Sequence, residues 1–485
     1  MAKHFYITTT LPYVNADPHI GFAQEIVHAD ILVRYHALSG DTVFFNTGTD
    51  EHGLKIYRKA LEGGRDPQEY VNECAEKFKQ LKSVLGLWEE INFIRTTDEY
   101  HKKAAQEFWR RCEKNGDIYK KNYKIKYCVG CELEKTGSEL NTEGYCPLHP
   151  NQKIETIEEE NYFFKFSKYQ KPLLEFYEKN SDFVVPDFRF NEIKAFTERG
   201  LEDFSISRLK EKMPWGVEVP GDDTHVMYVW FDALVNYISA IGWPASAKAP
   251  AGTARTEGNF EKWWPVTQLA GKDQIRQQAA MWQAMLFSAG LPQSRQIIIH
   301  GFITSGGQKM SKSLGNVVDP VKIVEEYGVD ALRYYLARHT HPFEDSDFTM
   351  EKFKEAYNAN LANGLGNAVS RIMKLAHTHL LQPVELLKPN SFPNEYTRGF
   401  QDFMPNKAMD FIWGKIGKLD ERITRERPFE IVKKNLTAGQ QMITEFVAEL
   451  YSIAYLLHPF MPKTYAIIKA IIKENKMPQP LFERK

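Results

Sequence analysis

The order of apolar and polar residues predicts a strand, a helix and a second strand at the start of the chain. An apolar run over 5–10 leads into a turn-rich segment, and apolar residues at helical spacing continue over 20–38. A second apolar run covers 42–46 and ends in Thr47-Gly48-Thr49-Asp50. This order is typical of a βαβ unit in an open parallel sheet. We therefore expect an α/β fold that binds its ligand at the carboxyl ends of the strands.

The same pattern returns after a long interval and predicts three more strands and one helix, the second half of one sheet. The strands are expected over 226–231, 267–270 and 296–299, and the helix over 274–289. Beyond Gly328 the strand signals stop, and a helical pattern predicts an α-helical bundle. The expected domains are the first half of the sheet, an insert, the second half of the sheet, a linker, and the bundle. Their ranges are 1–114, 115–222, 223–318, 319–350 and 351–485.

Composition narrows the class of protein. The chain has 485 residues, of which 43% are hydrophobic and 26% charged, so it is too apolar to be disordered and too long for one core. No uncharged stretch is apolar enough to cross a membrane. With five cysteines and no long apolar segment at its start, the chain is expected in the reducing cytoplasm.

Charge is distributed unevenly along the chain, although its net value is only −1. From residue 351 onward there are 20 Lys and Arg against 14 Asp and Glu, so this part carries about +6 and the rest about −7. A basic helical region suits the phosphates of a nucleic acid. Near-neutrality is therefore the sum of two regions with different expected partners.

Three of the cysteines form a candidate metal site with one histidine. Cys128 and Cys131 are a C-x-x-C pair, and Cys146 and His149 follow fourteen residues later as a C-x-x-H pair. Two ligands from each of two tight turns suit tetrahedral Zn²⁺ with no open position, which is a structural site. The alternative is a set of free thiols beside a surface histidine.

Two motifs indicate nucleotide chemistry, although the chain contains neither the dinucleotide nor the P-loop glycine pattern. His19 lies where the first strand turns into the first helix, beside a helix N-terminus that favours phosphate, although a lone histidine at such a turn is more often a cap. Lys309-Met310-Ser311-Lys312-Ser313 follows Gly306-Gly307 and suits a loop that closes over a triphosphate. An exposed basic loop is the plainer alternative.

Together the two motifs resemble the signatures of class I aminoacyl-tRNA synthetases, and further runs are similar to the methionyl-tRNA synthetase family over nearly the whole chain. These runs are Thr10–Asn15, Thr47–Gly53, Phe204–Arg208, Val229–Leu234, Gly271–Asp273, His300–Phe302 and Asn367–Arg371. The resemblance implies that the two halves of the sheet form a Rossmann-like catalytic domain with a zinc-bearing connective insert. It also implies that the linker over 319–350 contacts the tRNA stem and that the bundle is an α-helical anticodon-binding domain.

The resemblance also implies roles for individual residues. Asp50 would pair with the ammonium group of the amino acid, and Asp273 and Arg208 would support the adenylate. The residues implied for the side-chain pocket, whose aromatic walls suit a thioether, are Leu11, Tyr13, Trp230, Ala233, Leu234, Tyr237 and Gln278. Those implied for ATP are Pro12, His19, Gly21, Phe22, Gly271 and Lys312. Those implied to hold the phosphates during catalysis are His19, Lys309, Ser311 and Lys312.

The implied activity is that of a methionine–tRNA ligase. The carboxylate of L-methionine would attack the α-phosphate of ATP, and the methionyl group of the adenylate would then pass to the 3′ end of tRNA(Met). Mg²⁺ is implied as the companion of ATP. Contacts to the anticodon are implied for Asn363, Asn367, Arg371 and Phe429. Because the chain ends about where the bundle should end, we expect a monomer.

Two residues depart from the family pattern. Phe22 stands where the family usually has a hydrogen-bonding His or Asn, and Gln278 stands where it usually has His. Because Phe22 cannot form this hydrogen bond, one alternative is a synthetase-like protein that binds tRNA or a partner and activates no amino acid. Gln278 leaves open the same scaffold charging another amino acid. A nucleotidylyltransferase of related fold is a more distant alternative, since it would need neither the insert nor the basic tail. We favour methionine because the rest of the pocket matches.

Overall fold

The computed structural model describes residues 3–15, 17–131, 133–135, 137–244, 259–310, 316–389 and 391–485. The chain divides into two compact units. The first comprises Met1–Pro18, Thr42–Gln80 and Glu89–Ile299, and the second comprises His19–Asp41, Leu81–Trp88 and His300–Lys485. Each unit is therefore assembled from segments that lie far apart in the sequence.

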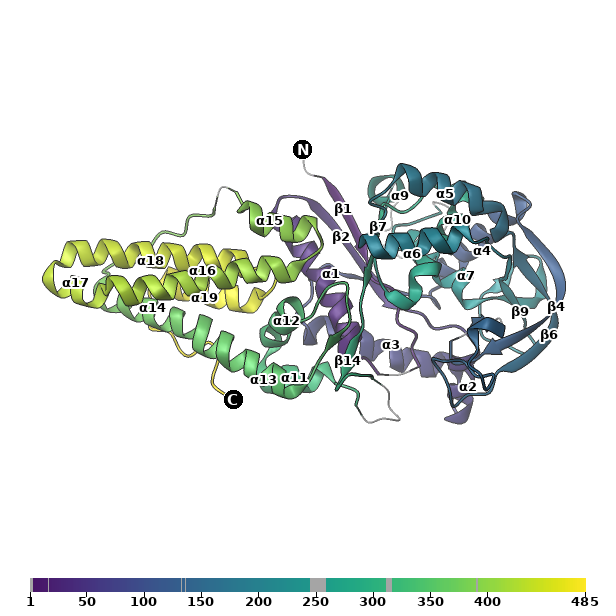
Figure 1. Ribbon diagram of the computed structural model, residues 1–485, viewed down its shortest axis with the longest axis horizontal. Helices are drawn as coiled ribbons and strands as arrows, with labels where there is room; N and C mark the ends of the chain where they lie inside the picture. The colour runs from purple at the N-terminus through teal and green to yellow at the C-terminus, as the bar shows by residue number, and fades with distance from the viewer. Residues whose placement is uncertain are drawn as a thin grey trace. The chain divides into compact units, whose positions relative to one another are not determined.

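A six-stranded sheet in the order β3-β2-β1-β12-β13-β7 organises the first unit. Figure 1 labels its strands β1, β2 and β7. Its strands are β1 (His4–Thr8), β2 (Thr42–Thr49), β3 (Asn92–Arg95), β7 (Val184–Val185), β12 (Thr267–Gly271) and β13 (Gln296–His300). The neighbours β1 and β2, β2 and β3, β1 and β12, and β13 and β7 pair in parallel. The segments that follow β1, β2 and β12 consequently meet at one edge of the sheet, as the sequence pattern predicts.

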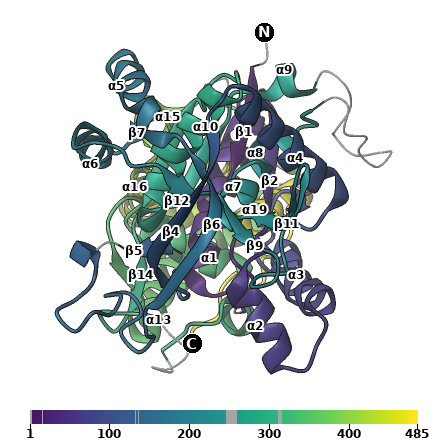
Figure 2. The same cartoon turned by 90° about the vertical axis from the view of Figure 1, so that its right-hand side faces the viewer.

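The part of the chain between β3 and β12 forms two smaller sheets. One has the order β5-β4-β6-β8 and the other β10-β11-β9, and the long strands β4 and β6 run antiparallel (Figure 2). Their strands are β4 (Ile118–Cys128), β5 (Leu133–Lys135), β6 (Glu155–Phe164), β8 (Phe204–Ser205), β9 (Ser207–Leu209), β10 (Glu218–Val219) and β11 (Asp222–Met227). The range predicted for the insert also supplies β7, where Val184 pairs with Ile297 of the parallel sheet.

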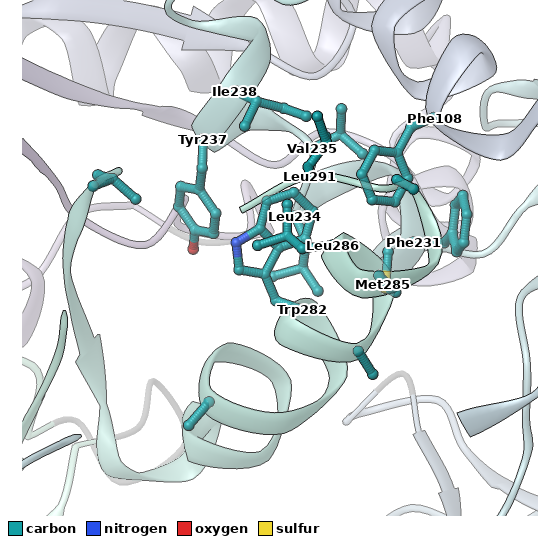
Figure 3. Close-up of a cluster of buried hydrophobic side chains, with 14 of the residues drawn as sticks. Phe108, Phe231, Leu234, Val235, Tyr237, Ile238, Trp282, Met285, Leu286 and Leu291 are labelled. Atoms are coloured by element: carbon teal, nitrogen blue, oxygen red, sulfur yellow. The ribbon is translucent and has the colours of Figure 1, made fainter. Parts of the chain in front are cut away.

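Aromatic side chains pack the helices of the first unit together. Trp282 stacks on Phe108 with ring centroids 5.5 Å apart and meets the edge of Tyr237 at 5.8 Å (Figure 3). The α-helices are α2 (Leu54–Glu62), α3 (Pro67–Val84), α4 (Glu99–Lys114), α5 (Gln170–Lys179), α6 (Asp187–Glu198), α7 (Val229–Ala233), α8 (Asn236–Ser239), α9 (Asn259–Trp263) and α10 (Trp282–Ser288). The shorter turns are η1 (Gly137–Glu139), η2 (Phe166–Tyr169), η3 (Lys272–Gln274) and the π-helix η4 (Gln277–Met281). This packing fixes α8 against α4 and α10.

The second unit is mainly helical. Its small sheet has the order β15-β14-β16 and consists of β14 (Ile303–Ser305), β15 (Gln308–Lys309) and β16 (Ser346–Asp347). Its helices are α1 (Ile20–Leu38), α11 (Pro320–Tyr327), α12 (Val329–Arg338), α13 (Met350–Ala356), the π-helix η6 (Tyr357–Gly366), α14 (Asn367–His379), α15 (Asn394–Gln401), α16 (Pro405–Glu426), α17 (Pro428–Lys434), α18 (Leu436–Leu457) and α19 (Pro462–Glu474). Among the described helices, none combines the length and the apolar composition needed to cross a bilayer.

A fully buried arginine ties the segments of the second unit together. The guanidinium of Arg333 on α12 donates to the Asp30 carboxylate of α1 at 2.7 Å. It also donates to the carbonyl oxygens of Leu85, Pro459 and Phe460, at 3.2, 2.9 and 2.7 Å. A buried guanidinium needs such partners for its donors. The loop between α18 and α19 is thereby joined to α1.

The predicted α/β fold with a helical C-terminal region is confirmed, and one predicted strand is wrong in its second half. The strand expected over 226–231 ends at Met227, and Val229–Ala233 forms the helix α7. The helix expected over 274–289 is present as far as Ser288, and Gln277–Met281 within it forms the π-helix η4. Periodicity alone does not separate a short buried helix from a short buried strand.

Candidate active site and zinc centre

The segments after β1 and β2 are joined backbone to backbone at the edge of the parallel sheet. The N–H of Asp50 donates to the Pro12 carbonyl at 3.0 Å, and the N–H of Val14 donates to the Asp50 carbonyl at 3.2 Å. These bonds form a bridge between Tyr13 and Asp50. Asp50 is only 7% exposed. The structure thus brings together two of the residues predicted to bind the amino acid.

The two residues after Asp50 are anchored by buried polar contacts. The carboxylate of Glu51 accepts two hydrogen bonds from Arg95, at 2.7 and 2.8 Å, and Trp215 donates its indole N–H to the Glu51 carbonyl at 2.6 Å. His52 Nδ1 donates to Asp232 Oδ2 at 2.7 Å. Burial raises the pKa of Asp232 above its ordinary value, and His52 opposes that shift. The Asp50 loop is therefore rigidly placed.

Aromatic and aliphatic side chains from α7 and α8 pack beside this loop. Trp230 and Tyr13 pack against a small cluster of Tyr127, Tyr228 and Val229, and Trp230 also packs on the main core. The Tyr6 hydroxyl of β1 donates to the Tyr237 carbonyl at 2.8 Å. Of the other residues predicted for the pocket, three have apolar side chains that are buried or partly buried. They are Leu11, Ala233 and Leu234.

Gln278 lies on the π-helix η4 and is 1% exposed. Its Oε1 accepts from Gln268 Nε2 of β12 at 2.7 Å, and its carbonyl accepts from Gln283 Nε2 at 2.9 Å. π-helices are rare in proteins, and those that occur are often at functional sites. Gln278 is thus held against the sheet by an amide pair, at the position where the resemblance implies a histidine.

Arg208, Gly271 and Asp273 lie on three other elements of the first unit, β9, β12 and η3. Arg208 on β9 donates to Ser205 Oγ and to the Ser207 carbonyl, both at 2.7 Å. Its guanidinium lies over the rings of Tyr228 and Tyr127, 4.5 and 5.2 Å from their centroids. Gly271 is buried at the end of β12, and Asp273 is exposed in the following turn. The supporting roles predicted for these residues remain predictions.

In the second unit, His19 is the N-cap of α1. Its Nδ1 accepts from the backbone N–H of Gly21 at 3.1 Å. A Cβ at Gly21 would lie 2.9 Å from the His19 ring and 3.9 Å from Met310 Cε, so a side chain there would displace the histidine. Phe22 is partly buried in the first turn of the same helix. The cap fixes the orientation of the imidazole beside the helix N-terminus.

The segment that precedes the predicted lysine loop is an anchored hairpin. Ser305 pairs with Gln308, and Gly306 and Gly307 between them have φ of 61° and 73°, as a type I′ turn requires. The Gly307 N–H donates to Asp347 Oδ1 at 2.7 Å. This bond, together with Lys352 and Thr304, holds the pKa of Asp347 below its usual value.

Two residues predicted for the lysine loop, Ser311 and Lys312, lie outside the described residues, as does the side chain of Lys309. The flanking residues approach the start of α1, because Met310 lies near Gly21 and the Ile20 N–H donates to the Val318 carbonyl at 3.0 Å. The two predicted nucleotide motifs are thus neighbours within one unit.

The four predicted metal ligands converge. The ligand atoms of Cys128, Cys131, Cys146 and His149 all lie within 4.8 Å of one another. Cys131 Sγ lies 3.3 Å from His149 Nδ1 and 3.4 Å from Cys146 Sγ. Ligands at about 2.0 and 2.3 Å from a tetrahedral zinc ion would be roughly 3.5–3.8 Å apart, so the residues fit this ion. A Cβ at Gly130 would lie 2.5 Å from the His149 ring, which explains the glycine between the two cysteines.

The residues predicted to contact the anticodon lie on the helical bundle. Asn363 and Asn367 are exposed, but Asn363 belongs to the π-helix η6, so its angular relation to Asn367 differs from that in an α-helix. Arg371 is ion-paired with Asp420 of α16. Phe429 is 40% exposed with Arg427 over its ring. Their contacts with RNA remain predictions.

Relatives with known activity match almost the whole chain. A family model described as "tRNA synthetases class I (M)" matches residues 5–156 and 143–373. The methionine–tRNA ligase of Thermotoga maritima is 41% identical over 477 residues, which cover 95% of this chain and 74% of that protein. The methionine–tRNA ligase of Thermosynechococcus vestitus is 39% identical over 483 residues, which cover 96% of this chain and 89% of that protein.

A solved structure has the same fold. Mycobacterium tuberculosis methionyl-tRNA synthetase in complex with methionyl-adenylate matches with a TM-score of 0.89 and 32% identity, covering 99% of this chain and 100% of that chain. The family match and the shared fold define a class I aminoacyl-tRNA synthetase. Within this class, the chain belongs to the methionyl-tRNA synthetase family.

Three buried residues of the site were not among the residues predicted from the sequence. Glu51 and His52 stand directly after Asp50, and Asp232 stands between Phe231 and Ala233. The available signal was an acidic residue in the otherwise apolar run Val229–Leu234. Its partner is 180 positions away, so no local pattern identifies the pair.

Proposed function

We propose that this protein activates L-methionine with ATP and transfers the methionyl group to the 3′ end of tRNA(Met). The observation that carries the proposal is the bridge between Tyr13 and Asp50 beside Trp230. A buried carboxylate suits the substrate ammonium, and aromatic walls suit a thioether. The carboxylate oxygen of methionine attacks the α-phosphorus, and pyrophosphate leaves with the electrons of the broken P–O bond.

His19 and the lysine loop supply the charge stabilisation in this proposal. The capped imidazole and the N-terminus of α1 would hold the phosphates, and Lys309 and Lys312 would offset the charge that develops on pyrophosphate. Pro12, Gly21, Phe22 and Gly271 would border the nucleotide. Mg²⁺ would accompany the triphosphate and neutralise its oxygens. The residues mainly position the reactants.

Zn²⁺ is the metal proposed for Cys128, Cys131, Cys146 and His149. When bound, it would cross-link the two turns and would take no part in the reaction. Val129, between two of the ligands, packs on the cluster that supports Trp230. The zinc centre would thus stabilise one wall of the proposed methionine pocket.

The direct test is amino-acid-dependent exchange of pyrophosphate into ATP with each of the twenty amino acids. The proposal expects exchange with methionine alone. Exchange with a different amino acid would identify that amino acid as the substrate in place of methionine. The buried Gln268–Gln278 pair favours this alternative. No exchange with any amino acid would favour a protein that only binds tRNA.

We further propose that the protein is a cytoplasmic monomer. Light scattering would measure its mass in solution.

Asn367→Ala and Arg371→Ala are expected to lower kcat/KM for tRNA charging about tenfold each, because each removes a hydrogen-bonding side chain from the proposed anticodon face. Pyrophosphate exchange should keep its wild-type rate. Asn394→Ala, an exposed asparagine at the start of α15, is the matched control. Equal losses in charging and exchange would contradict an anticodon role.

Phe22→His is expected to raise the rate of adenylate formation, because histidine restores a hydrogen bond of about 1–3 kcal/mol toward phosphate or ribose. Single-turnover formation of methionyl-adenylate measures this step. Phe22→Leu, which changes the size of the side chain without adding a donor, is the control. An unchanged or lower rate in Phe22→His would refute the expectation.

A further inference from the structure

A buried imidazole–carboxylate pair joins two walls of the proposed methionine pocket. His52 Nδ1 and Asp232 Oδ2 are 2.7 Å apart, and their side chains are 3% and 0% exposed. The Trp215 ring meets the imidazole edge to face, with centroids 5.8 Å apart. The pair is therefore shielded from water on the carboxylate side and held in one orientation.

The two partners come from segments with different proposed tasks. His52 stands two residues after Asp50, the proposed ligand of the substrate ammonium, on the loop that follows β2. Asp232 stands two residues after Trp230, the proposed wall for the thioether, on α7. The hydrogen bond between them thus sets the distance between the loop and the helix.

The other contacts of the Asp50 loop described above go to the edge of the parallel sheet and to Trp215, which donates its indole N–H to the Glu51 carbonyl. Asp50 is bridged to Tyr13 after β1, and Glu51 is bonded to Arg95 at the end of β3. Both attachments lie along the edge of the parallel sheet. The His52–Asp232 bond differs because it reaches across to α7.

We propose that Asp232 is a positioning residue for amino-acid binding, which acts through His52 to place the Asp50 carboxylate against the substrate ammonium. The inference rests on the proposed function, because it assumes that an amino acid is the ligand at Asp50. Replacing a buried pair by apolar residues is often neutral for stability, so placement of the loop is a reason for keeping two costly polar groups there. Asp232 itself does not touch the substrate.

The first test separates positioning from folding. Asp232→Asn keeps the size of the side chain but removes its charge, which replaces the charge-assisted bond from His52 with a weaker neutral one. This change is expected to raise KM for methionine about tenfold in pyrophosphate exchange. KM for ATP and the melting temperature should stay close to those of the unaltered protein. Asp223→Asn, at an exposed carboxylate of β11, is the matched control. Equal increases in both KM values, or an unchanged KM for methionine, would overturn the inference.

A second pair of variants covers the case in which Asp232→Asn fails to fold. The amide nitrogen of an asparagine at position 52 occupies nearly the place of the histidine Nδ1, so His52→Asn should retain the bond to Asp232. We expect His52→Asn to keep KM for methionine within about threefold of the unaltered value and His52→Ala to raise it at least tenfold. Equal effects of the two variants would indicate that only the volume of the imidazole matters, and would contradict the positioning role.

Ligand chemistry gives the sharpest readout. L-Methioninol keeps the ammonium group, whereas 4-(methylsulfanyl)butanoic acid lacks it, and the dissociation constants of both can be measured by competition with methionine. If Asp232 acts through Asp50, His52→Ala should weaken methioninol about as much as methionine and change the deaminated acid less than twofold. Equal weakening of both ligands would overturn the inference. Loss of methionine-dependent exchange in the unaltered protein would instead overturn the proposed function.

Discussion

Asp50→Asn is expected to raise KM for methionine roughly 30- to 150-fold. The asparagine keeps the shape of the side chain and can still accept a hydrogen bond, but it has no charge to oppose the substrate ammonium. A hydrogen bond to a charged group contributes about 2–3 kcal/mol, which corresponds to this range. Because the carboxylate is 7% exposed, water and salt screen the interaction little. Pyrophosphate exchange at varied methionine concentration measures the effect.

The specificity of this effect can be checked in the same assay. KM for ATP should change less than threefold, because Asp50 lies on the amino-acid side of the proposed site. The exposed-carboxylate variant Asp223→Asn should leave both constants unchanged. A parallel rise in KM for ATP and methionine would show that the substitution disturbs the sheet edge generally, and would count against an ion pair with the ammonium.

Loss of the metal is expected to unfold the turns that carry the four ligands. Cys131→Ser should lower the zinc content from one ion per chain to near zero and lower the melting temperature by on the order of 10 °C. Because Val129 supports the cluster behind Trp230, KM for methionine should rise as well. Metal analysis, thermal unfolding and exchange kinetics on the same preparation measure the three effects.

Two comparisons distinguish a zinc effect from a cysteine effect. Cys74→Ser replaces a partly buried thiol that is not among the four converging ligands, so it should keep the zinc and the melting temperature. Treatment of the unaltered protein with a chelator should reproduce the behaviour of Cys131→Ser, and added zinc should restore the melting temperature. Full stability of the metal-free protein would contradict a structural role for the ion.

The parallel sheet could be predicted from sequence because its signals are local. Apolar runs at β1 and β2 flank a helical pattern, and each strand ends in a polar or turn-forming segment. The run Val226–Phe231 was mispredicted because its residues are buried whichever element they form. The His52–Asp232 bond and the Tyr228 ring contacts, which hold this segment in place, join residues far apart in the sequence.

The same difference between local signals and long-range contacts applies to the residues of the candidate site. The zinc ligands could be predicted because the spacing within each pair already determines a tight turn, and the resemblance to a known family added Asp50. Long-range partners could not be predicted. The ion pair of Arg371 with Asp420 and the amide pair of Gln268 with Gln278 follow only from the packed structure. Both change how a predicted residue is presented to its ligand.

The buried Arg333 has a consequence for attempts to shorten this protein. A fragment that ends before Pro459 would remove two of the carbonyl oxygens that satisfy the guanidinium, while Asp30 stayed in place. Each buried donor left without its acceptor costs about 1–3 kcal/mol. The C-terminal helices therefore cannot be treated as a detachable module: a chimera that exchanges them must carry over the loop after α18 together with a matching α1 and α12.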